Sequence, residues 1–255
     1  MRIKVLAVAV TSVLVAALSA TSAQANHSWG GYHWARTSNP FTVKLGDNVS
    51  PQWDSSLAGA STDWSKSTVL DTTVVAGGTR PRNCKATPGM VQICNSTYGN
   101  TGWLGVASIS VTGGTHITQG TVKLNDTYFN TANYNTPAWR NLVTCQEIGH
   151  TFGLEHQDEN FNNANLGTCM DYTNAPSTNQ HPNQHDYEQL VTIYSHLDST
   201  TTVGQIAPTR ANAANAGNSP ATWGHQVEGS RAAGHSTYVR DDGHGNYLVT
   251  FVTWA

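Results

Sequence analysis

The residues best suited to chemistry lie between positions 146 and 156. This segment reads Gln-Glu-Ile-Gly-His-Thr-Phe-Gly-Leu-Glu-His. On a helix, Gln146 and His150 lie one turn apart on the same face, because side chains four positions apart are neighbours. Glu147 lies about 100° further around the helix, so its carboxylate can lean over the same point. The pattern predicts an amide, an imidazole and a carboxylate around one point of a helix.

A second imidazole depends on Gly153. If the helix continued to His156, that side chain would point to the side opposite His150. Glycine adopts positive φ without a steric penalty, so a turn at Gly153 can bring His156 back toward His150. Two imidazoles, the amide of Gln146 and an open fourth position form the arrangement of a catalytic zinc site. Glu147 would then be the general base for a zinc-activated water.

These residues resemble the motif of the metzincin clan of zinc endopeptidases, in which a His-Glu-x-x-His-x-x-Gly-x-x-His segment is followed by a methionine-containing turn. Identity and spacing match at Glu147, His150, Gly153 and His156. The segment Thr-Cys-Met-Asp-Tyr at 168–172 matches the turn, which the family calls the Met-turn. The arrangement is most similar to matrixin-like bacterial members of the clan.

The resemblance covers roughly residues 40–198 and implies an α+β fold of the metzincin type. Such a fold has a twisted mixed sheet, an active-site helix, a Met-turn and a C-terminal helix. The implied activity is hydrolysis of peptide bonds in a protein or peptide substrate, with zinc as cofactor. Met170 would pack beneath the site, and Tyr172 would contact zinc or stabilise the tetrahedral intermediate. Calcium is a further candidate cofactor, with oxygen ligands from Asp158, Glu159 and Asn162.

The sequence departs from the motif at Gln146, which stands where the family has its first zinc-binding histidine. An amide oxygen is a weaker zinc ligand than an imidazole nitrogen. Gln146 could bind weakly through oxygen, or another group could complete the site. The candidates for that group are Tyr172, Asp158, His116, His181 and His185. In a third alternative the metal is lost, and the chain is a catalytically inactive metzincin-fold protein that binds peptide or glycan.

The composition excludes other classes of protein. Only 11% of the 255 residues are charged, against roughly 25% in an average soluble domain, and the formal net charge is -3. Because 13 Lys and Arg are outnumbered by 16 Asp and Glu, we expect no nucleic-acid partner. The 8 Trp and 9 Tyr indicate a packed core rather than disorder. We expect the protein to be a monomer.

The first residues predict secretion. A basic start is followed by an apolar run over 5–18 and by Ala-Gln-Ala at 23–25, a small-x-small cleavage site. The run is shorter than the roughly 20 residues of a membrane-spanning helix, so a signal peptide over 1–25 is favoured over an anchor. The mature chain should begin near Asn26, be extracellular and have no membrane partner.

Four cysteines in a secreted chain predict disulfides, for which three connectivities are possible. We favour Cys84–Cys94, which closes a turn-rich loop, together with Cys145–Cys169. The second bond would join the helix of Gln146 to the Met-turn. A thiolate metal cluster is disfavoured, because the chain has no Cys-x-x-Cys pair.

Periodicity and turn residues divide the rest of the chain. Alternating or β-branched runs predict strands at 41–45, 69–75, 103–111 and 117–124. Ser50-Pro51 and Thr136-Pro137 are helix starts, because Ser and Thr cap helices and proline fits the first turn. Helices are expected at 51–66, 136–152 and 184–197.

These elements predict one main domain. The catalytic domain would span 26–198, followed by a linker at 199–220 and a C-terminal β-hairpin extension at 221–255. The hairpin strands are expected on either side of Asp241-Asp242-Gly243. A small binding module is the alternative for this last segment, although about 35 residues without cysteine rarely fold alone.

Overall fold

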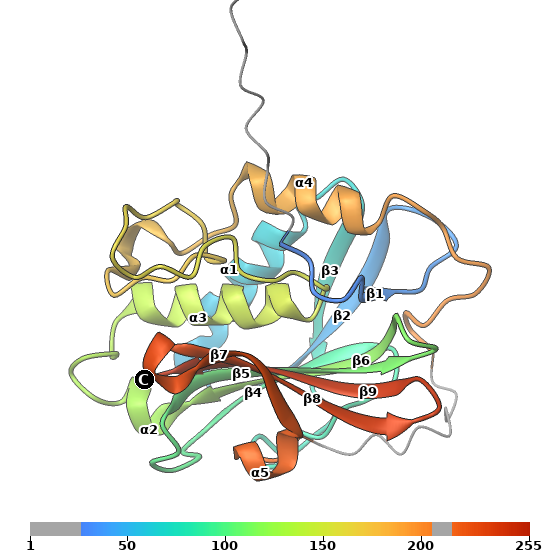
Figure 1. Cartoon of the computed structure of the whole chain (residues 1–255). Helices are drawn as coiled ribbons and strands as arrows, with labels where there is room; N and C mark the ends of the chain where they lie inside the picture. The colour runs from blue at the N-terminus through green and yellow to red at the C-terminus, as the bar shows by residue number, and fades with distance from the viewer. Residues whose placement is uncertain (1–26, 206–215) are drawn as a thin grey trace, which may run out of the picture.

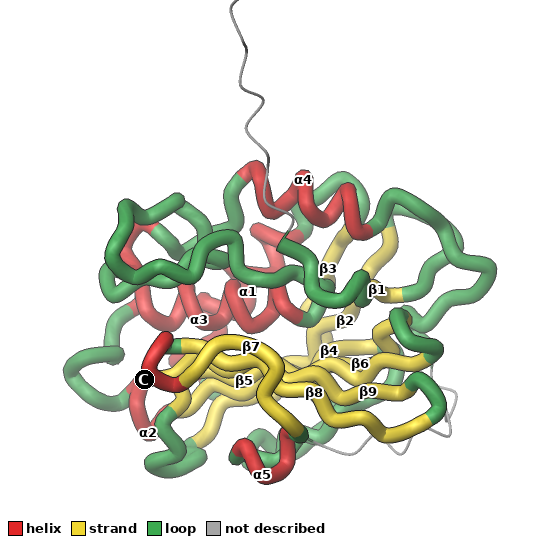
Figure 2. The backbone as a smooth tube through the Cα atoms, in the orientation of Figure 1, coloured by secondary structure: helices red, strands yellow, loops and turns green. Residues whose placement is uncertain are grey.

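The computed structural model of the chain describes residues 27–205 and 216–255. The predicted signal peptide at 1–25 lies outside the described residues. Helices and strands share one body in which the helices lie against a mixed sheet (Figures 1 and 2). The expected α+β class with a mixed sheet is therefore confirmed.

Nine strands of the described residues form a single sheet. Its order is β3-β2-β4-β6-β5-β9-β8-β7, and β1 pairs with β6 beside this path. Strands β3, β2, β4 and β6 run parallel, whereas β6, β5, β9, β8 and β7 alternate in direction. The bounds are β1 His33–Trp34, β2 Phe41–Asn48, β3 Leu70–Ala76, β4 Met90–Ser96, β5 Trp103–Thr112, β6 His116–Asn125, β7 His225–Ser230, β8 His235–Gly243 and β9 Asn246–Trp254.

Helices α1, α3 and α4 lie on one side of the sheet and α5 on the other (Figure 1). Helix α3 begins as predicted, because the Thr136 side chain accepts a hydrogen bond from the N–H of Trp139 and Pro137 occupies the first turn. The helix bounds are α1 Asp54–Trp64, α2 Asp126–Phe129, α3 Pro137–His150, α4 Gln184–Ile193 and α5 Pro220–Trp223. Short 3-10 turns lie at Pro51–Trp53, Pro176–Thr178 and Arg231–Ala233.

The main core joins α1 and α3 to the sheet. Trp64 of α1 is fully buried, and its indole N–H donates to the carbonyl of Cys145 on α3 at 3.1 Å. Phe152, just after α3, meets the Trp64 ring edge to face with centroids 5.8 Å apart. Aromatic side chains of this size each remove about 150–250 Å² from water. The helix that carries the predicted site is therefore firmly anchored.

Three predicted helices are shorter than expected. The one predicted at 51–66 starts as a 3-10 turn and ends at Trp64, and α3 ends at His150 rather than at 152. The helix predicted at 184–197 ends at Ile193. The chain leaves the helix at Tyr194, whose φ and ψ are -102° and 29° and whose buried hydroxyl donates to the carbonyl of Phe152 at 2.9 Å.

Three strands were not predicted. The strand β1 has only two residues, too few to show a period. Five of the seven residues of β4 are fully buried, so this strand lacks the alternation that would mark it. Strand β7 is mostly exposed at the edge of the sheet and carries no apolar pattern. Sequence periodicity gives no signal in any of these three cases.

The last strands continue the main sheet. β9 pairs antiparallel with β5, from Trp254 opposite Trp103 to Tyr247 opposite Val111. β8 and β9 form a hairpin as predicted, but its turn lies at residues 244–245, where His244 and Gly245 have φ of 55° and 73°. Two positive φ values suit the right-handed twist of a hairpin. Described parts of the predicted linker are also bonded to this body, since the N–H of Gly204 donates to the carbonyl of Gly89.

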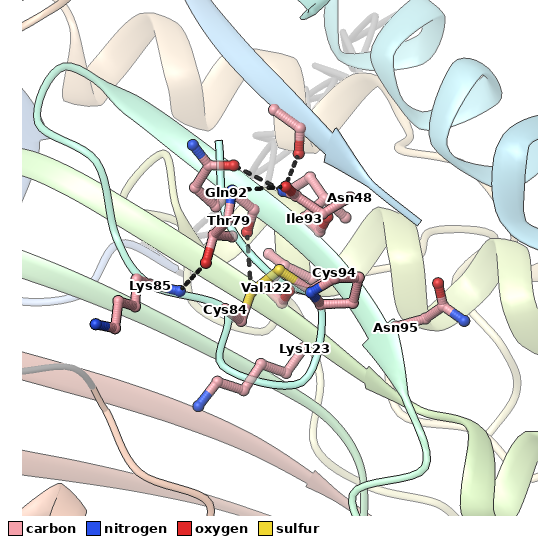
Figure 3. Close-up of a disulfide and its surroundings, with 12 residues drawn as sticks. Asn48, Thr79, Cys84, Lys85, Gln92, Ile93, Cys94, Asn95, Val122 and Lys123 are labelled. Carbon is pink, nitrogen blue, oxygen red and sulfur yellow. Dashed lines mark hydrogen bonds between the residues drawn. A yellow bond between two sulfur atoms is a disulfide. The ribbon is translucent and has the colours of Figure 1, made fainter. Parts of the chain in front are cut away.

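All four cysteines are paired, Cys84 with Cys94 and Cys145 with Cys169. The first bond ties a loop to β4, close to the hydrogen-bonded side chains of Asn48 and Gln92 (Figure 3). The second ties α3 to the segment before Met170. None of the helices in the described ranges has the length and apolar character needed to cross a bilayer.

Candidate metal centre

Helix α3 turns Gln146, Glu147 and His150 into the interior. These side chains are 2%, 0% and 1% exposed, since α3 lies over the sheet at strands β5 and β9 (Figure 1). Polar groups buried this deeply require partners, and those partners decide what the site can do.

The turn predicted at Gly153 is confirmed. Its φ is 92°, and a Cβ at this position would lie 2.0 Å from the carbonyl oxygen of Tyr32. Only glycine satisfies both constraints. The chain reverses after α3, and the ring of His156 returns to that of His150 with centroids 4.5 Å apart.

The two imidazoles face each other through their Nε2 atoms, which are 3.0 Å apart. The Nδ1 of His150 lies 2.9 Å from the carbonyl of Leu154, and the Nδ1 of His156 lies 2.7 Å from the Glu155 carboxylate. Both partners are acceptors, so we assign a proton to each Nδ1. Each Nε2 then offers a lone pair, and two lone pairs at this distance repel unless a proton or a cation lies between them. The pair is chemically fit to hold a metal ion.

Tyr172 adds a third donor atom. Its hydroxyl lies 2.7 Å from the Nε2 of His156. Its ring is held between those of Phe161 and His235, with centroid distances of 5.2 and 4.7 Å. The structure therefore brings together three of the residues predicted for the site: His150, His156 and Tyr172.

Charges near the pair act on the two rings in opposite directions. Burial, with the charge of His156, lowers the pKa of His150 to about 3. Burial alone would also lower the pKa of His156, but the hydrogen bond and charge of Glu155, helped by Glu159, raise that pKa to about 9. One ring is neutral and the other holds a proton, which a metal ion would displace from Nε2.

Glu147 is buried against the sheet. Its Oε1 lies 2.7 Å from the hydroxyl of Thr253 on β9, while its Oε2 has no hydrogen-bond partner. A Cβ on Gly105 of β5 would lie 2.4 Å from this Oε1, so glycine is needed to admit the carboxylate. Burial raises the pKa of Glu147 to about 8. The group can hold a proton near neutral pH, which suits an acid–base role.

Gln146 shares the same hydroxyl. Its Oε1 lies 2.9 Å from the Oγ1 of Thr253. A hydroxyl has one proton, so both contacts are satisfied when a protonated Glu147 donates to Thr253 and Thr253 donates to Gln146. The predicted ligand Gln146 thus belongs to a hydrogen-bond network with β9. The His and carboxylate atoms that lie close enough together here to ligate one metal ion belong to His150, His156 and Glu155.

The C-terminal strand also covers His150. The ring of Phe251 on β9 lies parallel to the imidazole, with centroids 4.5 Å and planes 5° apart. Beside this contact is a cavity of about 500 Å³ whose wall includes Gln146, Tyr172 and Thr253. Gln146 and Tyr172 reach this cavity, whereas Glu147, His150 and His156 are buried behind its wall.

Met170 lies beneath the helix. It is fully buried, and its Sδ would be 2.8 Å from a Cβ on Gly149 of α3. The Cys145–Cys169 disulfide fixes the same two segments. Met170 therefore packs against α3 at Gly149, next to His150 in the chain.

The distant histidines considered for the site make their contacts elsewhere. His116 lies 3.2 Å from Asp198, and His181 lies 2.6 Å from Asp63. The ring of His185 packs against that of His27, with centroids 4.9 Å apart. Tyr172 is the candidate that reaches His156.

The residues considered for calcium are engaged in other contacts. Glu159 lies 3.6 Å from the Nδ1 of His156 and 3.2 Å from the Nε2 of His235. Asp158 accepts hydrogen bonds from the N–H of Asn160 and the side chain of Asn163. These contacts give no support to a calcium site.

Sequence reasoning missed four residues of the centre. Glu155 directly precedes His156, and this adjacency is a signal that could have been read. Thr253, Phe251 and His235 carry no such signal, because they lie about 80 to 100 residues away in the chain and reach the site through sheet pairing.

No family model matches the sequence, and no curated protein matches it. A structure of myroilysin is 12% identical with a TM-score of 0.36, covering 64% of this chain and 96% of that one. High choriolytic enzyme 1, a hatching enzyme zinc-protease from Oryzias latipes (medaka fish), is 11% identical with a TM-score of 0.34, covering 64% and 94%. A crystal structure of myroilysin is 13% identical with a TM-score of 0.35, covering 67% and 86%.

Proposed function

We propose that the chain is a secreted zinc-dependent endopeptidase. His150 and His156 bind the metal, and Glu147 is the general base. The main support is the pair of Nε2 atoms 3.0 Å apart, on rings whose Nδ1 atoms both face acceptors. The two disulfides fit an oxidising compartment.

Tyr172 takes the place of the missing first histidine as third protein ligand. Zinc–nitrogen bonds of about 2.0–2.1 Å place two tetrahedral ligand atoms about 3.3 Å apart. The nitrogen pair at 3.0 Å is close to this spacing, and the Tyr172 hydroxyl, 2.7 Å from His156, would have to move outward by about 0.6 Å to share the ion. Glu155 orients the His156 ring from behind, as carboxylates do for metal-binding histidines.

When bound, zinc would supply Lewis-acid chemistry, lowering the pKa of water and polarising a carbonyl. In the ionised form of Glu147, Thr253 donates to Oε1, and the unpartnered Oε2 can accept a proton and deliver it to the leaving amine. Thr253 holds the other carboxylate oxygen, so the proton-carrying atom keeps a fixed position. A cation on the nearby imidazoles would favour the ionised form of Glu147 and make it a better base.

The substrate enters through the cavity. Its wall combines the aromatic side chains of Tyr134, Trp139 and Phe161 with the polar groups of Gln146 and Arg231. Polar and charged side chains, among them Glu159 and Asp171, make up much of the rest of the wall. This mixed lining can contact both the backbone amides and the side chains of a peptide.

A second candidate is a zinc-binding protein without catalysis. The observation that favours it is the closure of α3 by β9, through Thr253 on Glu147 and Phe251 on His150. In that case zinc holds α3, the Tyr172 segment and the fold together. The two candidates differ in whether Glu147 matters for any activity.

The test uses the full mature chain, loaded with zinc and incubated with a quenched fluorescent peptide library. The peptidase proposal predicts cleavage that chelation stops and zinc restores. Glu147→Gln should lower the rate by a factor of about 10²–10⁴ while keeping the zinc, since general bases contribute this much. Glu188→Gln, at an exposed position of α4, is the matched control and should retain full activity. A zinc-loaded chain that cleaves nothing would overturn the peptidase proposal in favour of the second candidate.

A further inference from the structure

A second cluster of histidines surrounds Asp198, outside the metal centre. The Oδ1 of Asp198 lies 3.5 Å from the Nε2 of His33, 3.2 Å from that of His116 and 3.8 Å from that of His196. The Nε2 atoms of His33 and His196 lie 3.2 Å apart. Three imidazole nitrogens thus converge on one carboxylate oxygen.

Three separate parts of the chain build this cluster. His33 on β1 pairs with His116 at the start of β6, which places their rings side by side with centroids 5.0 Å apart. The segment after α4 then brings His196 against His33, with centroids 4.6 Å apart, and delivers Asp198. The cluster joins the N-terminal segment, the β5–β6 hairpin and the chain after α4.

The spacing is that of a zinc site. Ligand atoms at the corners of a tetrahedral zinc site are about 3.3 Å apart, as follows from zinc–ligand bonds of about 2.0–2.1 Å. The distances among His33, His196 and Asp198 are 3.2, 3.5 and 3.8 Å. Their ligand atoms form a group close enough to share one ion.

The surroundings prepare these atoms for a cation. The Nδ1 of His33 lies 2.8 Å from the carbonyl of Gly31, which places a proton on Nδ1 and a lone pair on Nε2. The other oxygen of Asp198, Oδ2, accepts from the guanidinium of Arg36 at 3.0 Å and from its backbone N–H at 3.2 Å. Arg36 is itself buried and donates to the carbonyl of His196. The carboxylate is therefore held with Oδ1 turned to the imidazoles.

Exposure leaves an entry for an ion. The side chains of His33 and Asp198 are 6% and 9% exposed, whereas those of His116 and His196 are 33% and 52% exposed. His33 and Asp198 are therefore held in place, whereas the more exposed side chains of His116 and His196 have room to change rotamer and admit an ion from solvent.

We propose that His33, His196 and Asp198 bind a divalent transition-metal ion, with zinc the best fit, and that His116 completes the site as fourth ligand. Three imidazoles and a carboxylate are ligands that zinc prefers. Four protein ligands leave no open position, so the ion has a structural role. It fixes the N-terminal segment and the chain after α4 to the sheet, and it does not depend on the metal centre at His150 and His156.

The experiment starts from the full mature chain carrying His150→Ala and His156→Ala, so that only the second cluster is counted. After dialysis against a weak chelator, this chain should retain about one zinc, measured by mass spectrometry of the metal. Cobalt in its place should give the strong visible absorption of a tetrahedral site. Adding zinc to the metal-free chain should raise its melting temperature.

Further substitutions identify the ligands. His196→Ala, at an exposed position where a folding defect is not expected, should remove the zinc and abolish the rise in melting temperature. Asp198→Asn should do the same. His225→Ala, an exposed histidine of β7, is the control and should change neither. If the cluster is only a hydrogen-bond network, the starting chain will hold no zinc and zinc will not change its melting temperature, which overturns the proposal. Zinc retained in His196→Ala at full stoichiometry would also overturn it.

Discussion

The ring of Phe251 on the last strand lies parallel to the imidazole of His150, with centroids 4.5 Å apart. Two residues later, Thr253 contacts the side chains of Gln146 and Glu147. The polar face of α3 is therefore closed by the final strand of the chain. Phe251 and Thr253 therefore belong to the candidate metal centre, although they lie about 100 positions after it in the chain.

Removing the ring of Phe251 should loosen the centre. Phe251 is 1% exposed, and Phe→Ala changes in a core cost about 3–5 kcal/mol of unfolding free energy. We expect Phe251→Ala to unfold at lower urea and to release zinc to a chelator faster, with Phe251→Leu between it and the parent chain. Val227→Ala, on the exposed part of β7, is the control. Zinc release at the parental rate in Phe251→Ala would show that the stacking does not protect the centre.

The hydroxyl of Thr253 should matter more than its methyl group. Thr253→Val leaves the buried oxygens of Glu147 and Gln146 without their common partner, and an unsatisfied buried group costs about 1–3 kcal/mol. Thr253→Ser keeps the hydroxyl. The free energy of unfolding, measured with urea at pH 7, should therefore be highest for the parent chain, lower for Thr253→Ser and lowest for Thr253→Val. Equal stability of Thr253→Ser and Thr253→Val would show that the Thr253 hydroxyl does not stabilise the fold through Glu147 and Gln146.

Restoring a histidine at position 146 should strengthen metal binding. Gln146 and His150 lie one turn apart on α3, so an imidazole at 146 can reach the same ion. Gln146→His should lower the zinc dissociation constant by at least about tenfold, since imidazole is the stronger ligand. Competition with a chromogenic chelator measures this. Unchanged affinity would mean that the 146 side chain stays with Thr253.

The second arm of that experiment uses His150→Ala. Gln146→His should not strengthen binding in the absence of His150, because the gain requires two imidazoles on one face. A gain that persists there would place the new histidine in a different site.

Lys123 should make stability depend on pH. Its ammonium is buried and donates to the carbonyls of Ala216 and Gly217 at 2.6 and 3.1 Å. Burial lowers its pKa from 10.5 to about 8. Between these values the unfolded chain binds more protons, so this group makes the free energy of unfolding rise as pH increases from 8 to 10.5.

Comparing urea unfolding at pH 8 and pH 10 tests this dependence. In Lys123→Met, the increase in the free energy of unfolding between pH 8 and pH 10 should be smaller than in the parent chain, by at most about 3 kcal/mol. Lys44→Met, at an exposed position of β2, should leave the rise unchanged. A pH profile of Lys123→Met that parallels the parent would contradict the assignment.

The features that could be predicted from the sequence are local ones. The start of α3 follows from Thr136 and Pro137, and the reversal after it follows from Gly153, because capping and positive φ depend on neighbouring residues alone. The meeting of His150 and His156 is a consequence of these two local rules.

The features that could not be predicted depend on sheet pairing between distant segments. The contact of Thr253 with Glu147 exists because β9 pairs with β5 under α3. The cluster around Asp198 exists because β1 pairs with the start of β6. Neither pairing can be recognised from the spacing of the residues concerned, so the sequence predicts neither the contact of Thr253 with Gln146 nor that of His116 with Asp198.

The most direct test of the central claim is the zinc content of the full mature chain compared with its His150→Ala, His156→Ala variant. Both proteins are dialysed against a weak chelator, and circular dichroism checks that both are folded. If the two imidazoles hold a metal ion, the parent chain carries one zinc more than the variant, whatever the second cluster binds. Equal zinc in two folded proteins would contradict the account.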